Sequence, residues 1–465
     1  MATKTGAALT LAFFLSGCMM GQDYSRPEVD IPTQFRNAST EAKTVSPAYW
    51  WRQFGDPVLS EAVETALANN LDLTIATARL KEYEASRTTT AAPLWPQIGL
   101  AASETKNRQG NAPVVKNLQA GFTLAWELDF WGRIRRLSEA ANADYLSQEA
   151  ARQAVLLTLI SSVASSYIQL RELDSRLEMA RRTRDARRES ERLAQLRFKA
   201  GVISEMELRQ AGSELQTTLF SLQQLEQAVV QKENELSLLL GRNPGPIERG
   251  QPIETLSVPA IPSGLPSDVL ARRPDIRQAE QALIAAHARV GAAKASLFPT
   301  ISLTGNRGSA SPQLSGLFSG PNRVWSFVSS LTQPIFSGGG LLASLRVSEA
   351  RREQALAEYR KAIQSSFRET EDALIALQKS EEQKISQSKL VEEVRRYAHL
   401  ANLRYQAGIT SHLELLDAQR NLFAAEQGLA QAQSAVLIAS INLYKALGGD
   451  WAETINEPNG IKQKE

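Results

Sequence analysis

The sequence predicts a mainly α-helical protein with a small β part, in which one structural plan is written twice. Two stretches, at about 133–199 and about 341–407, contain neither proline nor glycine, and each is long enough for about 100 Å of helix. Shorter stretches alternate apolar and polar residues, which is typical of strands. The segment "RFKAGVISEMELRQA", beginning at Arg197, returns as "RYQAGITSHLELLDA" at Arg404. Similarity at a fixed separation of about 207 residues indicates an internal repeat.

The N-terminal residues predict a lipoprotein leader. An apolar run after Lys4 ends in "LSGC" at Cys18, which resembles the bacterial lipobox, so we expect residues 1–17 to be a signal peptide and Cys18 to carry lipid. Met19, rather than aspartate, follows the cysteine, and in lipoproteins of this kind that favours the outer membrane. The alternative is an ordinary leader with a buried cysteine. Since Cys18 is the sole cysteine, a disulfide within the chain and a cysteine metal site are excluded.

Composition and repeat divide the rest of the chain into five segments. An extended segment at 18–56 precedes a first repeat at 57–242. A connector at 243–273, rich in proline and glycine, leads to a second repeat at 274–450. Residues 451–465 form a C-terminal tail. No segment reaches the roughly 18 to 20 continuous apolar residues of a membrane-spanning helix.

Each repeat is expected to begin with a helix followed by two strands. The helices are predicted at about 57–90 and about 274–296. In "LQAGFTLAWEL", from Leu118, apolar and polar residues alternate, and "RVWSFVSSL", from Arg323, repeats this pattern. Weaker strands follow Pro96 and Pro299. Each repeat therefore contributes two strands of about ten residues.

The remainder of each repeat is expected to be a long helical hairpin. Its first helix ends at a glycine, Gly201 or Gly408, which can adopt positive φ, and Ser204 or Ser411 can cap the next helix. That second helix carries apolar residues at intervals of seven, as in coiled coils. They are Leu208, Leu215, Leu222, Val229 and Leu236 in the first repeat, and Leu415, Leu422, Leu429, Val436 and Leu443 in the second.

Four strands cannot close a membrane barrel by themselves. Open sheet edges cost several kcal/mol for each unpaired backbone group in lipid, and the smallest closed barrels have about eight strands. Two copies would give eight strands and a filled barrel, whereas three would give twelve strands and a lumen. We therefore expect a homotrimeric tube with one end in a bilayer. The alternative is a soluble coiled-coil protein with a small sheet.

Longer motifs carry a family resemblance over essentially the whole mature chain. They are "SGC" with "DYSRP", "WWRQFGDPVL", "WELDFWGRIR", "ARRPDIRQAEQAL", "GAAKASLFPTISLTG", "RYQAGITSHLELLDAQR" and "NLYKALGG". Together they resemble the TolC-like outer-membrane efflux factors, in the lipoprotein branch of OprM/NodT type. The resemblance implies a trimer with a 12-stranded outer-membrane β-barrel continued by a long periplasmic α-helical barrel. It also implies the exit duct of a tripartite pump, with a periplasmic adaptor and an inner-membrane transporter of RND type as partners.

The resemblance also assigns roles to the two repeated turns. Turns of this pattern in the family meet the adaptor and narrow the periplasmic mouth, and charged and aromatic residues beside them hold the closed mouth. Here the adaptor-contact turns would contain Arg197, Gly201, Val202, Ser204, Gly408, Ile409 and Thr410. We expect the periplasmic gate on the second hairpin, at Tyr405, Asp417, Arg420 and Arg404, because Asp417 and Arg420 are neighbours on one helix face. A plain capping turn and a solvated ion pair are the alternatives.

Four aromatic residues are candidates for the membrane barrel or its rim, since aromatic side chains favour the membrane interface. The alternative is packing where strand meets helix. These residues are Trp126, Trp131, Trp325 and Phe327.

Nothing in the sequence points to an enzyme or to a cofactor. There are three histidines, His287, His399 and His412, and no metalloprotease, nucleophile-elbow or phosphate-loop motif. The net charge of +2 does not favour nucleic acid as a partner. We therefore expect a passive duct for small molecules such as drugs or toxic organics. A duct for metal ions or secreted proteins, or a periplasmic tether without a pore, remains open.

Overall fold

The computed structural model describes residues 19–33, 35–36, 49–259, 269 and 272–449. The expectations for the leader, for Cys18 and for the 451–465 tail fall outside the described residues. The described residues form two compact units. The sheet unit holds those up to Val29, from Thr77 to Ala151 and from Asp275 to Ala362; the hairpin unit holds the rest. Each unit takes residues from both repeats.

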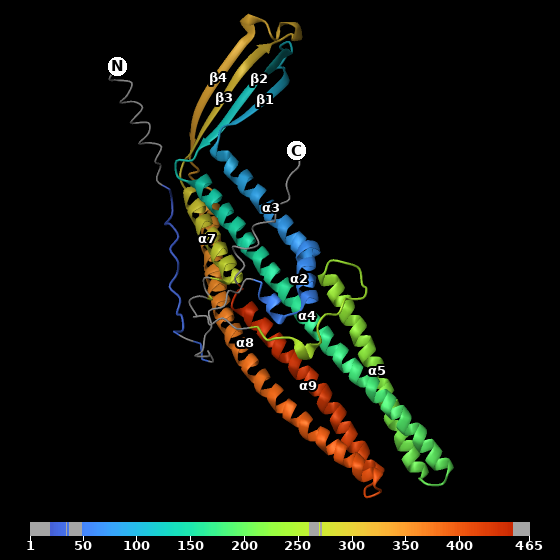
Figure 1. Ribbon diagram of the computed structural model, residues 1–465. Helices are drawn as coiled ribbons and strands as arrows, with labels where there is room; N and C mark the ends of the chain where they lie inside the picture. The colour runs from blue at the N-terminus through green and yellow to red at the C-terminus, as the bar shows by residue number, and fades with distance from the viewer. Residues whose placement is uncertain (1–18, 34, 37–48, 260–268, 270–271, 450–465) are drawn as a thin grey trace. The chain divides into compact units, whose positions relative to one another are not determined.

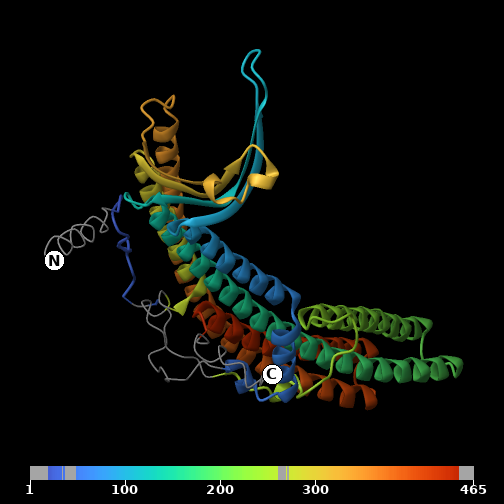
Figure 2. The same cartoon turned by 90° about the horizontal axis from the view of Figure 1, so that it is seen from above.

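The sheet unit contains one antiparallel sheet of four strands, which confirms the two strands expected in each repeat. They are β1 (Gln97–Asn107), β2 (Val115–Leu128), β3 (Thr300–Ser311) and β4 (Arg323–Thr332), in the order β1-β2-β3-β4 (Figure 1). The two repeats meet at the β2–β3 pair, where Leu124 lies opposite Gly305. Within the described chain, β1 and β4 each have an unpaired edge. Figure 2 shows that the four strands curve together rather than lying flat.

The two faces of this sheet differ in chemistry. Residues directly opposite each other in antiparallel strands share a face, so the registers assign every side chain. One face carries large apolar residues that are exposed in the protomer: Ile98, Leu100, Phe122, Trp325, Phe327 and Leu331, at 57–80%. The opposite face carries mostly small or polar residues, together with the exposed valines Val115, Val324 and Val328. The small or polar residues include Gly99, Ser103, Gln119, Thr123, Thr304, Asn306, Ser326 and Ser330.

In the same unit, helices extend from one end of the sheet (Figure 1). These are the later part of α3 (Leu71–Ala91), α7 (Pro274–Ala295), and the first parts of α4 (Arg133–Lys199) and α8 (Gly340–Gln406). Small side chains let α4 and α7 approach closely: Ala140, Ala143, Ala285 and Ala288 are all buried in one cluster.

The helix predicted at about 57–90 is interrupted, so that prediction was wrong in one detail. The structure has α2 (Pro57–Asn69) and then α3, separated by Asn70 with an extended ψ of 131°. The Asn70 side-chain oxygen accepts a hydrogen bond from the Leu73 N–H at 3.0 Å, and its amide donates to the Leu239 carbonyl at 3.0 Å. Asn70 therefore ends one helix, caps the next and ties both to a distant helix end.

The hairpin unit pairs the later part of α4 with α5 (Glu205–Leu239) and the later part of α8 with α9 (His412–Ala446) (Figure 1). The predicted seams face inward. Leu215, Leu222, Val229 and Leu236 on α5, and Leu415, Val436 and Leu443 on α9, are all buried. Short 3-10 turns complete the described elements: η1 (Trp50–Phe54), η2 (Ala92–Leu94), η3 (Ile253–Thr255), η4 (Leu314–Gly316) and η5 (Gly320–Asn322).

The largely aliphatic core of the hairpin unit contains a group of buried aromatic residues. Trp50 is fully buried and stacks on Tyr444, with ring centroids 5.1 Å apart. The Tyr167 hydroxyl, also buried, donates to Asp56 Oδ2 at 2.8 Å, and Asp56 caps α2. One apolar window of α4 is long enough to cross a membrane by length and composition, but 61% of it is buried inside the protein. That burial is what a core helix shows.

Candidate functional site

The turns at the ends of the two long helices have the same backbone geometry. Val202 N–H donates to the Arg197 carbonyl at 2.9 Å, and Ile409 N–H donates to the Arg404 carbonyl at 2.9 Å. The intervening glycines, Gly201 and Gly408, both have a φ of 72°. This is the Schellman arrangement that closes a helix. The repeated sequence therefore encodes a repeated turn.

The two turns differ in how the following helix begins. The Ser204 hydroxyl accepts from the Glu207 N–H at 3.3 Å, as expected for a cap. Ser411 occupies the N-cap position but its side chain makes no capping hydrogen bond. In its place, the Thr410 hydroxyl donates to Glu414, which also lies 3.4 Å from Arg404. The capping hydrogen bond predicted at Ser411 is therefore not formed, and the Thr410–Glu414 and Glu414–Arg404 contacts connect the turn to the first turn of α9.

Both turns present an apolar side chain outward. Val202 is 71% exposed and Ile409 is 69% exposed. Apolar residues at an exposed helix tip are candidates for contact with another protein.

The predicted gate residues Asp417 and Arg420 belong to a network larger than a helix-face pair. Arg420 Nη2 lies 3.7 Å from Asp417, and its Nε lies 3.7 Å from Glu214 on α5. Glu214 also lies 3.6 Å from Arg187 of α4, which donates to the Gln419 side chain at 2.6 Å. These side chains join the α4–α5 hairpin to α9.

Tyr405 provides a second connection between the hairpins. Arg197 Nη1 donates to the Tyr405 hydroxyl at 3.1 Å. On its other side the Tyr405 ring lies 5.3 Å from the His412 ring. Arg197, predicted as an adaptor contact, therefore also touches a predicted gate residue.

Burial lowers the pKa of two basic groups at this tip. The Arg187 side chain is 5% exposed, and burial lowers its pKa more than the nearby Glu214 raises it. Burial likewise lowers the pKa of His412, helped by Arg187 and Arg197 and opposed by Glu207 and Glu214. His412 Nδ1 is buried without a hydrogen-bond partner among the described residues.

Sequence reasoning missed Arg187, Glu214 and His412. Ala180, Arg187 and Ala194 are buried on α4 at intervals of seven. A charged residue at a seam position between two alanines indicates a buried charge, and this pattern could have identified Arg187 from the sequence. His412, named above only as one of three histidines, is half-buried against Tyr405.

The four candidate aromatic residues separate into two pairs. Trp325 and Phe327 lie on the exposed apolar face of the sheet. Trp126 donates its indole N–H to the Leu94 carbonyl at 3.1 Å, and Trp131 donates to the Pro299 carbonyl at 2.9 Å. The latter pair therefore packs where strands meet helices. In the described part of the chain, no group of three or more His, Cys, Asp or Glu side chains could hold a metal ion.

The comparisons with known proteins agree with this architecture. The family model "Outer membrane efflux protein" matches residues 62–242 and 265–449. The chain is 37% identical to a toluene efflux pump outer membrane protein, TtgC of Pseudomonas putida, over 98% of each chain. It is 34% identical to the cation efflux system protein CusC of Escherichia coli, covering 94% of this chain and 98% of the relative.

A solved structure shows the same fold. The MtrE outer membrane channel of Neisseria gonorrhoeae, in its open state, superposes with a TM-score of 0.85 at 31% identity, over 93% of this chain and 98% of MtrE. The family match, the two full-length relatives and this neighbour lead to one conclusion. The chain belongs to the outer membrane efflux protein family and has the TolC-type channel fold.

Proposed function

We propose that this protein is the outer-membrane channel of a tripartite efflux pump and acts as a passive exit duct for small molecules. The observation that carries the proposal is the four-stranded sheet, which has one exposed apolar face, one polar face and two open edges. In membrane barrels, apolar side chains face lipid and polar ones line the lumen. The large apolar residues exposed here, such as Phe327 and Leu331, would be covered by lipid.

The open edges require more than one copy of the chain. Four strands per chain, three times over, give a twelve-stranded barrel with a lumen. A homotrimer would also bring six helical hairpins into one periplasmic tube. The predicted lipid on Cys18 would add an anchor in the outer membrane.

The partners follow from the exposed tips. A periplasmic adaptor would contact the two turns, including Val202 and Ile409, whose apolar side chains are exposed. An inner-membrane transporter, of RND type by family resemblance, would supply energy and choose the cargo. The relatives' names include both toluene and cation efflux, so the cargo class depends on that transporter. Organic molecules are our first candidate, and cations are the second.

We also propose that the charged network at the helix tips holds the duct closed. Asp417 and Arg420 lie on α9, while Glu214 and Arg187 lie on the other hairpin. Opening the mouth by moving one hairpin against the other would have to break the Glu214–Arg420 and Arg197–Tyr405 contacts. Three copies of these acidic side chains around a constriction would also favour cations over anions.

Conductance across a planar lipid bilayer tests the duct and its gate together. The purified protein should form discrete channels, and Asp417→Ala with Arg420→Ala should raise the single-channel conductance. The matched control is Glu205→Ala with Arg209→Ala, an exposed ion pair on α5, which should leave the conductance unchanged. A protein that forms no channel would refute the duct. Equal conductance in wild type and the gate variant would refute the gate.

A further inference from the structure

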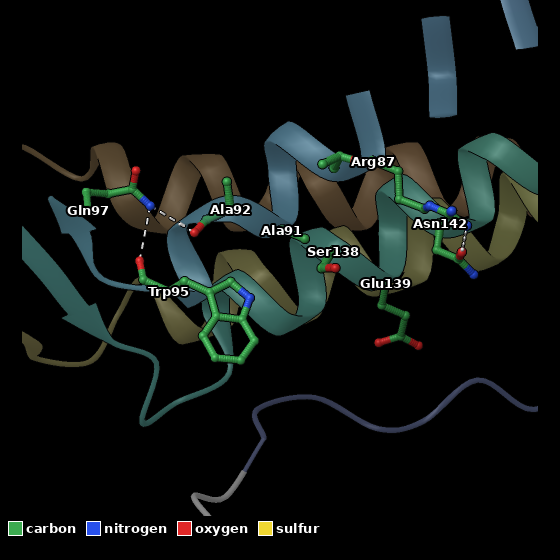
Figure 3. A pocket seen from close by; sticks show the side chains of 9 residues that line it. Arg87, Ala91, Ala92, Trp95, Gln97, Ser138, Glu139 and Asn142 are labelled. Carbon is green, nitrogen blue, oxygen red and sulfur yellow. Dashed lines mark hydrogen bonds between the residues drawn. The ribbon is translucent and has the colours of Figure 1, made fainter. Parts of the chain in front are cut away.

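An open pocket lies at the base of the sheet, where the first repeat enters β1. It has a volume of about 690 Å³ and is lined by the end of α3, the start of β1 and the first turns of α4 (Figure 3). Gln97 donates to the Ala92 and Trp95 carbonyls, and Arg87 donates to Asn142 across the pocket. The Trp95 side chain borders the pocket and is 74% exposed.

In the second repeat, the residues that lead into β3 are packed against the loop that follows β2. The correspondence between the repeats is limited to the residues that lead into each strand, because the other wall of the open pocket is α4 and the other wall of the small cavity is the loop after β2. Ala92, Trp95 and Gln97 of the open pocket correspond, about 203 residues on, to Ala295, Phe298 and Thr300. Those three residues line a cavity of only about 10 Å³.

The loop that follows β2 packs against the residues that lead into β3. Trp131 stacks on Phe298 with ring centroids 4.7 Å apart, and its indole N–H donates to the Pro299 carbonyl at 2.9 Å. Phe130 lies against Trp131 at 4.9 Å. The segment that packs against Phe298 is therefore the loop immediately after β2, the strand paired with β3.

β1 has no neighbouring strand on the corresponding side within the described protomer, so no loop covers Trp95 there as the loop after β2 covers Phe298. By the repeat, the counterpart of the loop after β2 is the loop after β4: "DFWGR" at Asp129 matches "IFSGG" at Ile335. Gly132 and Gly338, at matching positions, both have positive φ, at 77° and 60°. Ile335 and Phe336 are each 90% exposed, as expected of side chains whose binding site lies on another molecule.

Strand direction brings this loop to the residues that lead into β1 in a closed barrel. All neighbouring strands are antiparallel, so a β4–β1 pair between copies puts the end of β4 beside the start of β1. Phe336 follows Thr332, the last residue of β4, by four residues, a reach of at most about 14 Å.

We propose that Trp95, beside the open edge of β1, is a docking site for a second copy of this chain, contacted by Ile335 and Phe336 of that copy. The contact would correspond, between chains, to the packing of the loop after β2 within one chain, with Phe336 at the position of Phe130 and Ser337 at that of Trp131. This inference rests on the proposed trimeric channel and names the side chains that join its protomers at the base of the barrel.

Cross-linking between differently tagged copies tests this docking. One copy carries Trp95→Cys and the other Phe336→Cys; the only natural cysteine is Cys18, the predicted lipid site. After co-expression, membranes are treated with a short bifunctional maleimide, and doubly tagged dimers are quantified. Because proximity raises the effective concentration of the two thiols to about the mM range, the dimer should exceed that of the control pair by about tenfold. The control pairs Trp95→Cys with Phe318→Cys, whose side chain is 80% exposed in the β3–β4 connection.

The outcomes separate the docking from the duct. The docking is supported if doubly tagged dimers form with Trp95→Cys and Phe336→Cys but not with the control pair. Cross-links that form only when both cysteines are in one chain overturn it, as do equal yields from both pairs. A conducting trimer without the Trp95–Phe336 cross-link rejects the docking and leaves the duct intact, whereas a monomeric wild type rejects the duct itself.

Discussion

Glu214→Ala removes the one carboxylate that lies near both Arg187 and Arg420. Arg187 would keep the Gln419 side chain as a hydrogen-bond partner but would lose its nearby anion. Removing one partner of a fully buried ion pair costs about 3–5 kcal/mol. Here the Arg187–Glu214 separation is 3.6 Å and the Arg420 side chain is 52% exposed, so we expect a smaller loss, about 1–3 kcal/mol. Such a loss corresponds to an increase of about 5- to 150-fold in local opening.

Hydrogen exchange of the protein in lipid vesicles measures that opening directly. Amides near Arg187 and near Arg420 should exchange faster in Glu214→Ala, while those around the buried Trp50 should not change. The control is Glu205→Ala, which removes a shorter ion pair, 3.0 Å from Arg209, whose side chains are 63% and 77% exposed. An exposed pair of this kind is worth about 0.3–0.5 kcal/mol. If Glu205→Ala accelerates exchange as much as Glu214→Ala, burial does not make the Glu214 contacts more stabilising than an exposed ion pair, and the predicted difference is refuted.

Three further predictions concern pH, strand packing and the core. Because burial lowers the pKa of His412 below its ordinary 6.5, the unfolded tip binds a proton more readily, and local stability should fall as pH drops below about 6.5. The protection factors of amides at the second turn, which correct the exchange rate for its own pH dependence, should then fall in wild type and stay constant in His412→Gln. A Cβ at Gly308 would overlap a backbone oxygen of β2, so Gly308→Ala should lower the temperature at which the trimer dissociates in detergent, whereas Gly320→Ala, with open space around it, should not; equal shifts would contradict this. Tyr167→Phe removes a buried hydroxyl that donates to Asp56 and should cost about 1–3 kcal/mol; an unchanged urea midpoint, read from tryptophan fluorescence, would exclude that cost.

The long helices and the strands could be predicted from local sequence patterns alone. The stretches without glycine or proline became α4 and α8, and Gly201 and Gly408 end them because glycine adopts positive φ without strain. The break at Asn70 could not be predicted in this way. Its amide bonds to a carbonyl 169 residues away, and no local pattern reports such a partner.

The candidate site was predictable only within one hairpin. Asp417 and Arg420 were expected as neighbours because they are three residues apart on one helix, and they lie 3.7 Å apart. Their links to Glu214 and Arg187 depend on how two hairpins pack, which spacing along one helix does not encode. The aromatic residues show the same limit: alternation placed Trp325 on a strand face but could not tell it from Trp126, whose indole bonds to the backbone.

The open edges of the sheet couple membrane insertion to assembly. β1 has 11 residues and β4 has 10, and in an antiparallel sheet about half of an edge strand's N–H and C=O groups point outward. At several kcal/mol for each unpaired group in lipid, inserting a lone protomer would cost tens of kcal/mol. This cost exceeds the stabilisation gained by burying its apolar face in lipid. Pairing between copies removes that cost, and a side-chain contact such as Phe336 with Trp95 of the next copy can form outside the hydrocarbon. Copies should therefore associate before, or together with, entry of their strands into the bilayer.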